Sequence, residues 1–182
     1  MTFVKKSPKL AFLSAALILV LGGCLGVPEG ARPVESFALD QYLGKWYEIA
    51  RLDHSFERGL SNVTAEYSLR DGGGVKVVNR GFKTTDGKWQ EAEGKAFFVD
   101  DTSTGKLKVS FFGPFYGAYN VIALDEKAYQ WSLVAGPSTD YLWILSRTPV
   151  LDQIVVEQLL SQANSLGFDT EALIFVNQNQ EQ

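Results

Sequence analysis

Between residues 45 and 147 the chain alternates short apolar, β-branched stretches with turns rich in glycine and aspartate. Most of these turns contain an Asp-Gly, Gly-Gly or Gly-Pro pair, and such pairs favour a reversal of the chain. Eight consecutive hairpin-linked strands predict an all-β fold, an up-and-down antiparallel sheet that closes into a barrel, because closure removes the exposed sheet edges. The predicted strands span residues 45–52, 61–70, 75–84, 88–99, 106–112, 117–124, 128–135 and 141–147.

After Arg147 the apolar period changes from two residues to three or four, which is typical of an α-helix. Thr148 is placed to cap this helix, Pro149 fits its first turn, and Gly167 is placed to end it. The sequence therefore predicts a C-terminal helix packed on the outside of the barrel, followed by a β-like run at 172–176 that pairs back onto the barrel. One stripe of apolar residues would face the barrel: Leu151, Val155, Leu159, Ala163 and Leu166.

The N-terminus has the pattern of a secretion signal. Three lysines precede the uncharged apolar run 10–21. Its last residue begins the quartet Leu21-Gly22-Gly23-Cys24. The run would extend only about 18 Å as a helix, whereas the hydrocarbon core of a bilayer is about 30 Å thick. We therefore expect residues 1–23 to be a signal peptide. Residues 24–36 contain several glycines and prolines and are expected to be a tether, 37–177 the barrel domain, and 178–182 a polar tail.

Cys24 is the only cysteine of the chain. The quartet that it ends resembles the lipobox of bacterial lipoproteins, in which the thiol is acylated, for example with palmitate, and becomes the first residue of the mature chain. Leu25, rather than an aspartate, then implies export to the outer membrane. The alternative is an ordinary signal peptide with an incidental cysteine.

Composition excludes several classes of function. Without residues 1–23 the formal charge would be about −7, and no basic cluster remains for nucleic acid. With Cys24 acylated, the folded part has neither a disulfide nor a cysteine nucleophile. His54 is the only histidine, so a multi-histidine metal site is impossible, and we expect no metal and no cofactor. We interpret His54 as an ordinary loop histidine rather than a catalytic base.

Gly44-Lys45-Trp46-Tyr47 opens the first predicted strand, and Arg147 ends the eighth. This pair of motifs resembles the lipocalin family, in which the arginine lies over the tryptophan and closes the base of the barrel. In a closed antiparallel barrel Trp46 and Arg147 would indeed lie at one end on neighbouring strands. Asp125 matches only the aspartate of the family's middle motif. Gly44, Trp46, Asp125 and Arg147 are therefore the predicted closure residues.

The resemblance covers residues 37–177. It is strongest to the bacterial outer-membrane lipoproteins of the family, related to apolipoprotein D, through Gly44 to Arg51, Lys108 to Gly117 and Tyr141 to Pro149. It implies a barrel lipid-anchored in the outer membrane and facing the periplasm, and it allows a homodimer.

Side chains alternate inward and outward along a strand. If Arg147 points inward, the same phase in neighbouring strands gives an apolar lumen with a charged exterior. For strands 88–99 and 128–135 the sequence does not decide which residues point inward. In strand 117–124 the alternation that makes Tyr119 an inward residue also makes Ala123 one. The spacing of the inward residues does not distinguish a barrel that encloses a ligand cavity from one with a solid core, but the family resemblance favours a cavity. The predicted ligand cavity consists of Val63, Ala65, Tyr67, Val77, Asn79, Val109, Phe111, Tyr119, Tyr141 and Trp143.

An apolar cup suits a molecule with an acyl chain. The predicted function is binding, storage or transport of long-chain fatty acids or lysophospholipids for maintenance of the cell envelope, with no catalytic residue. Arg51, Arg58 and Arg80 are interpreted as solvated surface charge, although each is near enough to the mouth to attract an anionic headgroup. The aromatic hairpin 111–117 either contacts a membrane or a second copy, or folds inward. The alternatives are an enzyme on the same scaffold, a haem carrier and a purely structural envelope protein.

Overall fold

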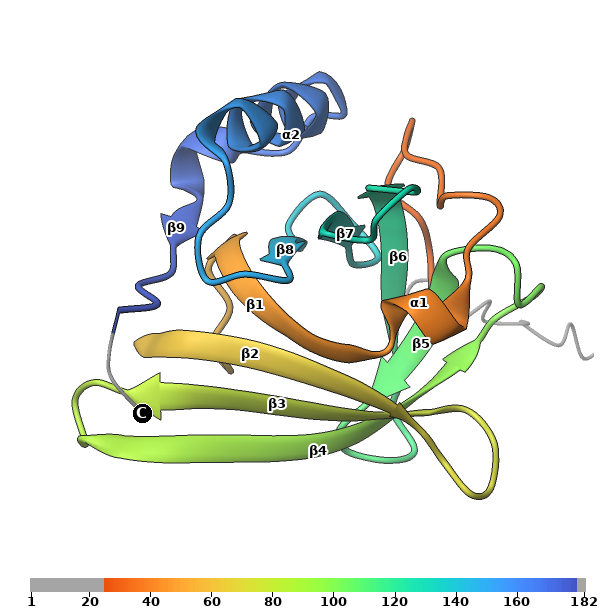
Figure 1. Cartoon of the computed structure of the whole chain (residues 1–182), viewed down its shortest axis with the longest axis horizontal. Helices are drawn as coiled ribbons and strands as arrows, with labels where there is room; N and C mark the ends of the chain where they lie inside the picture. Colours follow the sequence, from red (N-terminus) through yellow and green to blue (C-terminus); the bar gives the residue numbers. More distant parts are fainter. Residues whose placement is uncertain (1–24, 180–182) are drawn as a thin grey trace, which may run out of the picture.

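A computed structural model describes residues 25–179. In this part of the chain, eight strands form a closed antiparallel barrel (Figure 1), because each strand pairs with the next and β8 pairs back onto β1. The predicted fold class is thereby confirmed. The strands are β1 (Gly44–Arg51), β2 (Leu60–Leu69), β3 (Val75–Lys83), β4 (Lys88–Phe98), β5 (Lys106–Ser110), β6 (Gly117–Leu124), β7 (Trp131–Ala135) and β8 (Leu142–Ser146).

The largest difference from the predicted strand limits is the start of β7, at Trp131 rather than residue 128. Asp125 causes it, because its carboxylate accepts hydrogen bonds from the backbone N–H groups of Lys127, Ala128 and Gln130. These bonds hold residues 125–130 in a turn, where Tyr129 has a φ of 53°.

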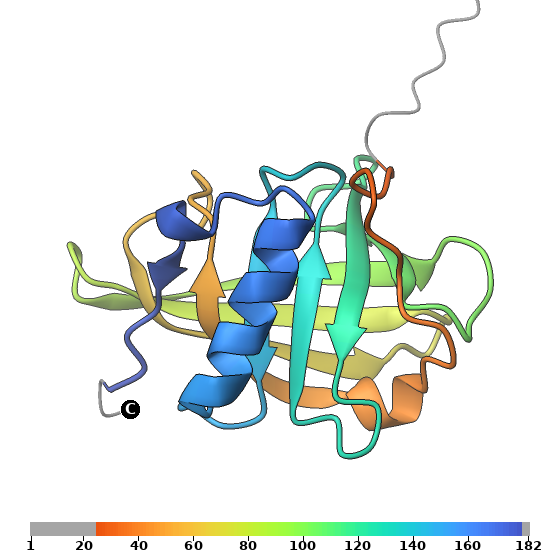
Figure 2. The same cartoon turned by 90° about the horizontal axis from the view of Figure 1, so that it is seen from above.

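The segment 25–36 lies along the barrel wall beside β6 (Figure 2) and is not a free tether. The N–H of Val34 donates to the carbonyl of Val121 at 2.8 Å, and the N–H of Gly105 donates to the carbonyl of Val34 at 2.9 Å. Nearer the start of the segment, Asn120 Nδ2 donates to the carbonyl of Gly26 at 3.0 Å. The glycines and prolines of this segment predicted a linker. The hydrogen bonds that hold it on the barrel are made with residues far away in the sequence, so the composition of the segment does not reveal them. The short helix α1 (Leu39–Tyr42) follows.

The C-terminal helix α2 (Gln153–Ser165) packs across the outside of the barrel, as Figure 2 shows. It begins later than predicted: Asp152, not Thr148, is the N-cap, with its carboxylate accepting from the N–H of Ile154 at 2.8 Å. The Thr148 hydroxyl donates instead to the carbonyl of Val150. Gly167, with a φ of 84°, follows the C-cap as predicted. The 3₁₀ turn η1 (Thr170–Ala172) leads to β9 (Ile174–Phe175), which pairs antiparallel with β1.

The apolar side chains form two cores. One lies inside the barrel and includes Trp46, Val77 and Leu145. The other lies between the barrel wall and α2 and includes Ile144, Leu159 and Ala163. Neighbours in sequence such as Ile144 and Leu145 thus belong to different cores, as alternation along a strand requires. Within the described residues, no helix is both long and apolar enough to cross a bilayer.

Candidate ligand site

The closed end of the barrel is sealed by Trp46 and Arg147. Trp46 is fully buried, and the Arg147 guanidinium carbon lies 3.9 Å from the centre of its ring system. The guanidinium also donates to three backbone carbonyls, those of Lys45, Gln41 and Tyr129, at 2.9, 2.6 and 3.2 Å. It therefore ties β1, α1 and the turn before β7 together across the base of the barrel.

Gly44 and Asp125 support this seal through the backbone. Gly44 has a φ of 90°, which L side chains rarely adopt, and an added Cβ would lie 3.5 Å from Arg147 Nη1. Asp125 orders the turn 125–130, and that turn supplies the Tyr129 carbonyl to Arg147. All four predicted closure residues therefore lie at the same end of the barrel.

Above the seal, hydroxyl groups form a small network inside the barrel. The Tyr42 hydroxyl lies 2.7 Å from that of Tyr119 and 3.1 Å from Ser132 Oγ, and the Tyr67 hydroxyl lies 2.8 Å from that of Tyr119. Burial raises the pKa of Tyr42 to about 12, so these groups are uncharged at neutral pH. The network satisfies polar atoms in an otherwise apolar floor.

Most of the ten predicted cavity residues come together in the interior. Asn79 pairs directly with Ala65 and shares its face, and Val63 is buried beside Gly81. Tyr141 lies outside the interior cluster, where it stacks on His54 with ring centres 4.8 Å apart. The other seven belong to the interior cluster or pack against it: Ala65, Tyr67, Val77, Val109, Phe111, Tyr119 and Trp143.

The structure also shows which residues face inward in β4 and β7, the two strands that the sequence left undecided, and it corrects the inward assignment of Ala123. Ala96 and Phe98 of β4 face the interior, as do Ser132 and Val134 of β7. Ala123 faces α2 instead of the lumen, because a β-bulge between Val121 and Ala123 shifts the register by one residue.

Several side chains that face the upper part of the lumen keep accessible surface. Burial raises the pKa of the Tyr119 hydroxyl well above its usual value. The Tyr119 side chain as a whole is only half-buried. Ala65, Val109 and Trp143 also face inward and keep accessible surface. Water therefore reaches these inward side chains.

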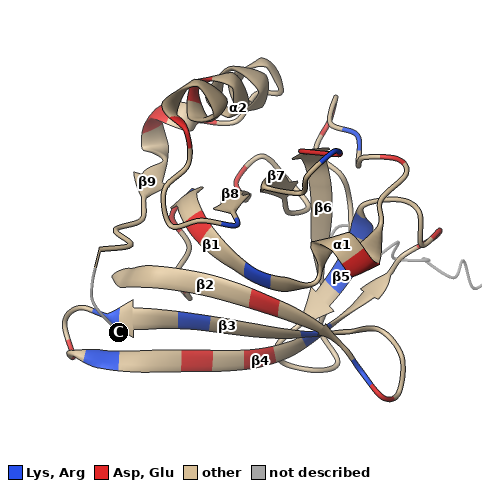
Figure 3. Cartoon of the chain, in the orientation of Figure 1, with Lys and Arg blue, Asp and Glu red and all other residues tan. Residues whose placement is uncertain are grey.

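Charged residues are frequent along β3 and β4, as Figure 3 shows. Lys76 pairs with Glu93 at 2.8 Å, and the Arg80 guanidinium lies 4.3 Å from the Trp89 ring centre. Arg80 is exposed there, and Arg58 is exposed in an ion pair with Asp53, so both agree with solvated surface charge.

Sequence reasoning missed a buried polar group at the open end, which we call the mouth cluster: Glu48, Arg51, His54, Glu57 and Trp143. Arg51 is only 1% exposed, so its interpretation as surface charge was wrong. Its Nη1 donates to Glu48 Oε1 at 2.6 Å, and its Nη2 donates to the Glu57 carbonyl at 2.8 Å. Arg51 thus fixes the 52–59 loop to β1.

A β-bulge between Glu48 and Ala50 explains the error about Arg51. Strict alternation from the inward Trp46 would turn Arg51 outward. The bulge turns both Ile49 and Ala50 outward, into the core beneath α2, and Arg51 then pairs with the inward-facing Trp143. No glycine or other turn residue marks this bulge in the sequence.

The remaining members complete the mouth cluster around Trp143. Its indole Nε1 donates to Glu57 Oε2 at 3.0 Å, and the His54 ring lies 4.9 Å from it. His54 is a loop residue, as expected, but it is buried. Burial and the Arg51 charge lower the pKa of His54, which favours the neutral imidazole at pH 7.

The two carboxyl groups of the mouth cluster interact. Burial, followed by the nearby Glu57, raises the pKa of Glu48 to about 8, although Arg51 opposes the shift. Burial also raises the pKa of Glu57. Near neutral pH the pair therefore retains a proton. Within residues 25–179 no three His, Cys, Asp or Glu side chains are grouped as metal ligands would be.

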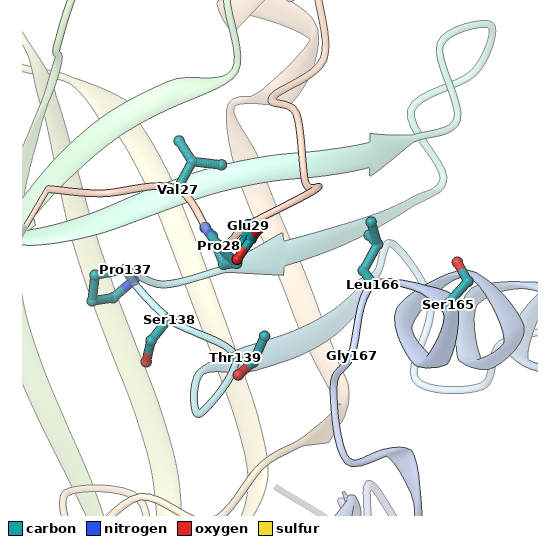
Figure 4. Close-up of a pocket in the computed structure, with 9 residues that line it drawn as sticks. All are labelled: Val27, Pro28, Glu29, Pro137, Ser138, Thr139, Ser165, Leu166 and Gly167. Atoms are coloured by element: carbon teal, nitrogen blue, oxygen red, sulfur yellow. The ribbon is translucent and has the colours of Figure 1, made fainter.

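Two features lie on the surface near the open end. A hollow of about 590 Å³ separates segment 25–36 from the 136–141 turn and the end of α2; Figure 4 shows its lining residues, which include Pro28, Ser138 and Leu166. In the 111–117 hairpin, Phe112 and Phe115 are 80% and 78% exposed, whereas Phe111 faces the lumen. Inward folding of the whole hairpin is therefore wrong.

Comparison with known proteins agrees with this geometry. A family model described as a lipocalin-like domain matches residues 37–178. The chain is 56% identical to the outer membrane lipoprotein Blc of Vibrio cholerae, covering 88% of this chain and 94% of that protein. It is 35% identical to apolipoprotein D of Bos taurus over 89% and 93% of the two chains. The solved structure of insecticyanin from the tobacco hornworm, Manduca sexta, is 26% identical, with a TM-score of 0.67 and coverage of 84% and 86%.

Proposed function

The chain belongs to the lipocalin family, and we propose that it binds long-chain fatty acids or lysophospholipids in its barrel and stores or transports them for maintenance of the cell envelope. The observation that carries this proposal is the apolar lumen, closed below by Trp46 and Arg147 and retaining accessible surface around Trp143 and Tyr119. Its role is binding, and no side chain is given a chemical step.

Hydrophobic transfer is sufficient for such a ligand. Each methylene group that leaves water contributes about 0.8 kcal/mol, so roughly 16 of them contribute on the order of 13 kcal/mol. Association costs of about 4–15 kcal/mol offset much of this gain. At the low end of these costs a net gain of roughly 8–9 kcal/mol remains, which corresponds to a dissociation constant near micromolar even without contacts to the headgroup.

The protein is anchored by lipid in the outer membrane, as its relatives named outer membrane lipoprotein Blc are. The anchor in this proposal is Cys24, acylated after removal of residues 1–23, with the barrel on the periplasmic side. Cys24 lies outside the described residues. Metabolic labelling with an alkynyl palmitate tests this step: wild type should be labelled, and Cys24→Ser should not.

The exposed Phe112 and Phe115 support a contact of the 111–117 hairpin with the membrane or with a second copy in a homodimer. Sedimentation of the Cys24→Ser chain at several concentrations, with and without phospholipid vesicles, distinguishes the two. A concentration-dependent dimer that Phe112→Ser abolishes favours self-association, and vesicle binding without a dimer favours the membrane.

The binding proposal is tested on the chain from residue 24 onward with Cys24→Ser, since segment 25–36 packs on the barrel and is better left intact. Native mass spectrometry after incubation with palmitate or with lysophospholipid should show one bound lipid on the folded protein. A folded chain that retains neither lipid class would refute the proposed function.

A further inference from the structure

Exposed aromatic side chains lie at the open end of the barrel. Phe56 is 64% exposed in the loop after β1, and Phe112 and Phe115 are exposed in the 111–117 hairpin, which contains no charged residue. Neighbouring exposed aromatic side chains, such as Phe112 and Phe115, indicate contact with an apolar partner. Four loops border this end: 52–59, 84–87, 111–116 and 136–141.

The start of segment 25–36 is held at the same end. The carbonyl groups of Gly26 and Gly136 accept hydrogen bonds from one amide nitrogen, Asn120 Nδ2, at 3.0 and 3.1 Å. A Cβ added to Gly26 would lie 3.4 Å from the carbonyl oxygen of Pro137. Gly26 is therefore packed against the 136–141 turn. Figure 2 shows the first described residues, coloured red, at the edge of the barrel where β6 begins.

Very little chain separates this docked start from Cys24, the proposed site of acylation. Leu25 is the only residue between Cys24 and Gly26, so the Cα atoms of these two residues are at most about 7 Å apart. Further along the segment, the hydrogen bonds of Val34 with the barrel wall keep it in place. A membrane that holds the acyl groups of Cys24 therefore lies next to the open end of the barrel and not next to its sealed base.

Three places around the mouth can then meet one surface: the docked start of the segment beside the 136–141 turn, the loop of Phe56, and the 111–117 hairpin. Three separate contacts fix the orientation of a rigid body on a plane. We propose that the open end of the barrel faces the membrane that holds the Cys24 acyl groups, with Phe112 and Phe115 inserted among its lipids. This inference rests on the acylation of Cys24 in the proposed function, and it does not require that a lipid occupies the lumen.

The test compares two fluorescent labels at opposite ends of the barrel. Cys24 is the only cysteine, so an acylated chain has no free thiol until one is introduced. Gly113→Cys places a label in the 111–117 hairpin, and Gly72→Cys places one in the 70–74 loop at the closed end. Among the described residues no atom lies within 4 Å of a Cβ added at either glycine, so both positions accommodate the side chain.

Each labelled, acylated chain is incorporated into phospholipid vesicles that contain a spin-labelled phospholipid as quencher. The label at Gly113 should be quenched several times more strongly than the label at Gly72. Thr139→Cys, in the 136–141 turn, is a second probe of the open end that leaves the hairpin unchanged, and it should be quenched like Gly113→Cys.

A released form of the protein supplies the control. A Gly-Ser linker of ten residues inserted after Leu25 extends about 17 Å on average, and Phe112→Ser with Phe115→Ser removes the inserted side chains. With all three changes the Thr139→Cys label should lose most of its quenching while the barrel stays folded, as circular dichroism will show.

Equal quenching of the labels at the two ends, or stronger quenching at Gly72, overturns the inference. A Gly113 label that is shielded from water but not quenched by lipid also overturns it, because a second copy would then cover the hairpin. A chain recovered without acyl groups overturns the inference together with the proposed anchor. None of these outcomes affects the binding proposal, which is tested on the Cys24→Ser chain in the absence of a membrane.

Discussion

Replacement of Arg147 by alanine should destabilise the barrel without removing its ligand site. The substitution removes a cation–π contact with the Trp46 ring, worth about 0.5–2 kcal/mol. It also removes three hydrogen bonds to backbone carbonyls, which contribute modestly because the guanidinium is half-exposed and water can replace it. Together we expect a loss of about 2–4 kcal/mol in the free energy of unfolding.

For a chain of this length such a loss lowers Tm by roughly 5–15 °C. Calorimetry and urea unfolding of the Cys24→Ser chain measure it. Arg147→Lys is the matched control: it keeps the charge but loses the planar fork that reaches three carbonyls, so its Tm should lie between those of wild type and Arg147→Ala. Lipid affinity, measured well below Tm, should change little in either variant. A Tm within about 2 °C of wild type for Arg147→Ala would show that the seal contributes nothing measurable.

Three further outcomes are expected. Trp143→Ala should weaken lipid binding about tenfold or more in titrations that follow lipid retention by mass spectrometry, while Tm falls less than in Arg147→Ala; the opposite pattern contradicts the division of roles. Burial raises the pKa of Glu48 in the folded state, so that state holds a proton that the unfolded chain releases, and stability should fall as pH rises from about 4.5 to about 8. Urea unfolding of Glu48→Gln should show a weaker dependence on pH, with only the contribution of Glu57 remaining. Asp152→Ala should cost about 1 kcal/mol through loss of the α2 cap, whereas Thr148→Ala should not weaken the start of the helix, as thermal unfolding of both variants will show.

The barrel and much of its lumen were predictable from the sequence because both follow from regular alternation. Turn residues mark the hairpins, and one inward residue fixes the phase of a strand until a bulge intervenes. Val77, Val109 and Trp143 lie on uninterrupted stretches, and the structure places all three in the interior as expected.

The mouth cluster was not predictable in the same way. Two bulges, at Glu48/Ala50 and Val121/Ala123, reverse the expected direction of Arg51 and Ala123. A charged residue at a strand end ordinarily faces water, so only the three-dimensional pairing of Arg51 with Glu48 and the Glu57 carbonyl reveals its burial. A signal was nevertheless present: Glu48 and Arg51 are an acid and a base of opposite charge within one predominantly apolar strand.

The docking of segment 25–36 was missed for a related reason. Its glycines and prolines indicate only that the backbone avoids regular structure. Whether such a segment is free or packed depends on partners such as Asn120 and Gly105, which are distant in the sequence. The same holds for the start of α2, where Thr148 and Asp152 are both acceptable caps and the position of the helix on the barrel decides between them.

The central claim is that the acyl chain occupies the barrel lumen, and a crystal structure of the Cys24→Ser chain with a bound lysophospholipid tests it most directly. The account predicts continuous density for the acyl chain between Tyr119 and Trp143, with its far end above the Tyr42 hydroxyl network. Density for the chain in the surface hollow beside Pro28 and Leu166, with the lumen filled by side chains, would contradict it.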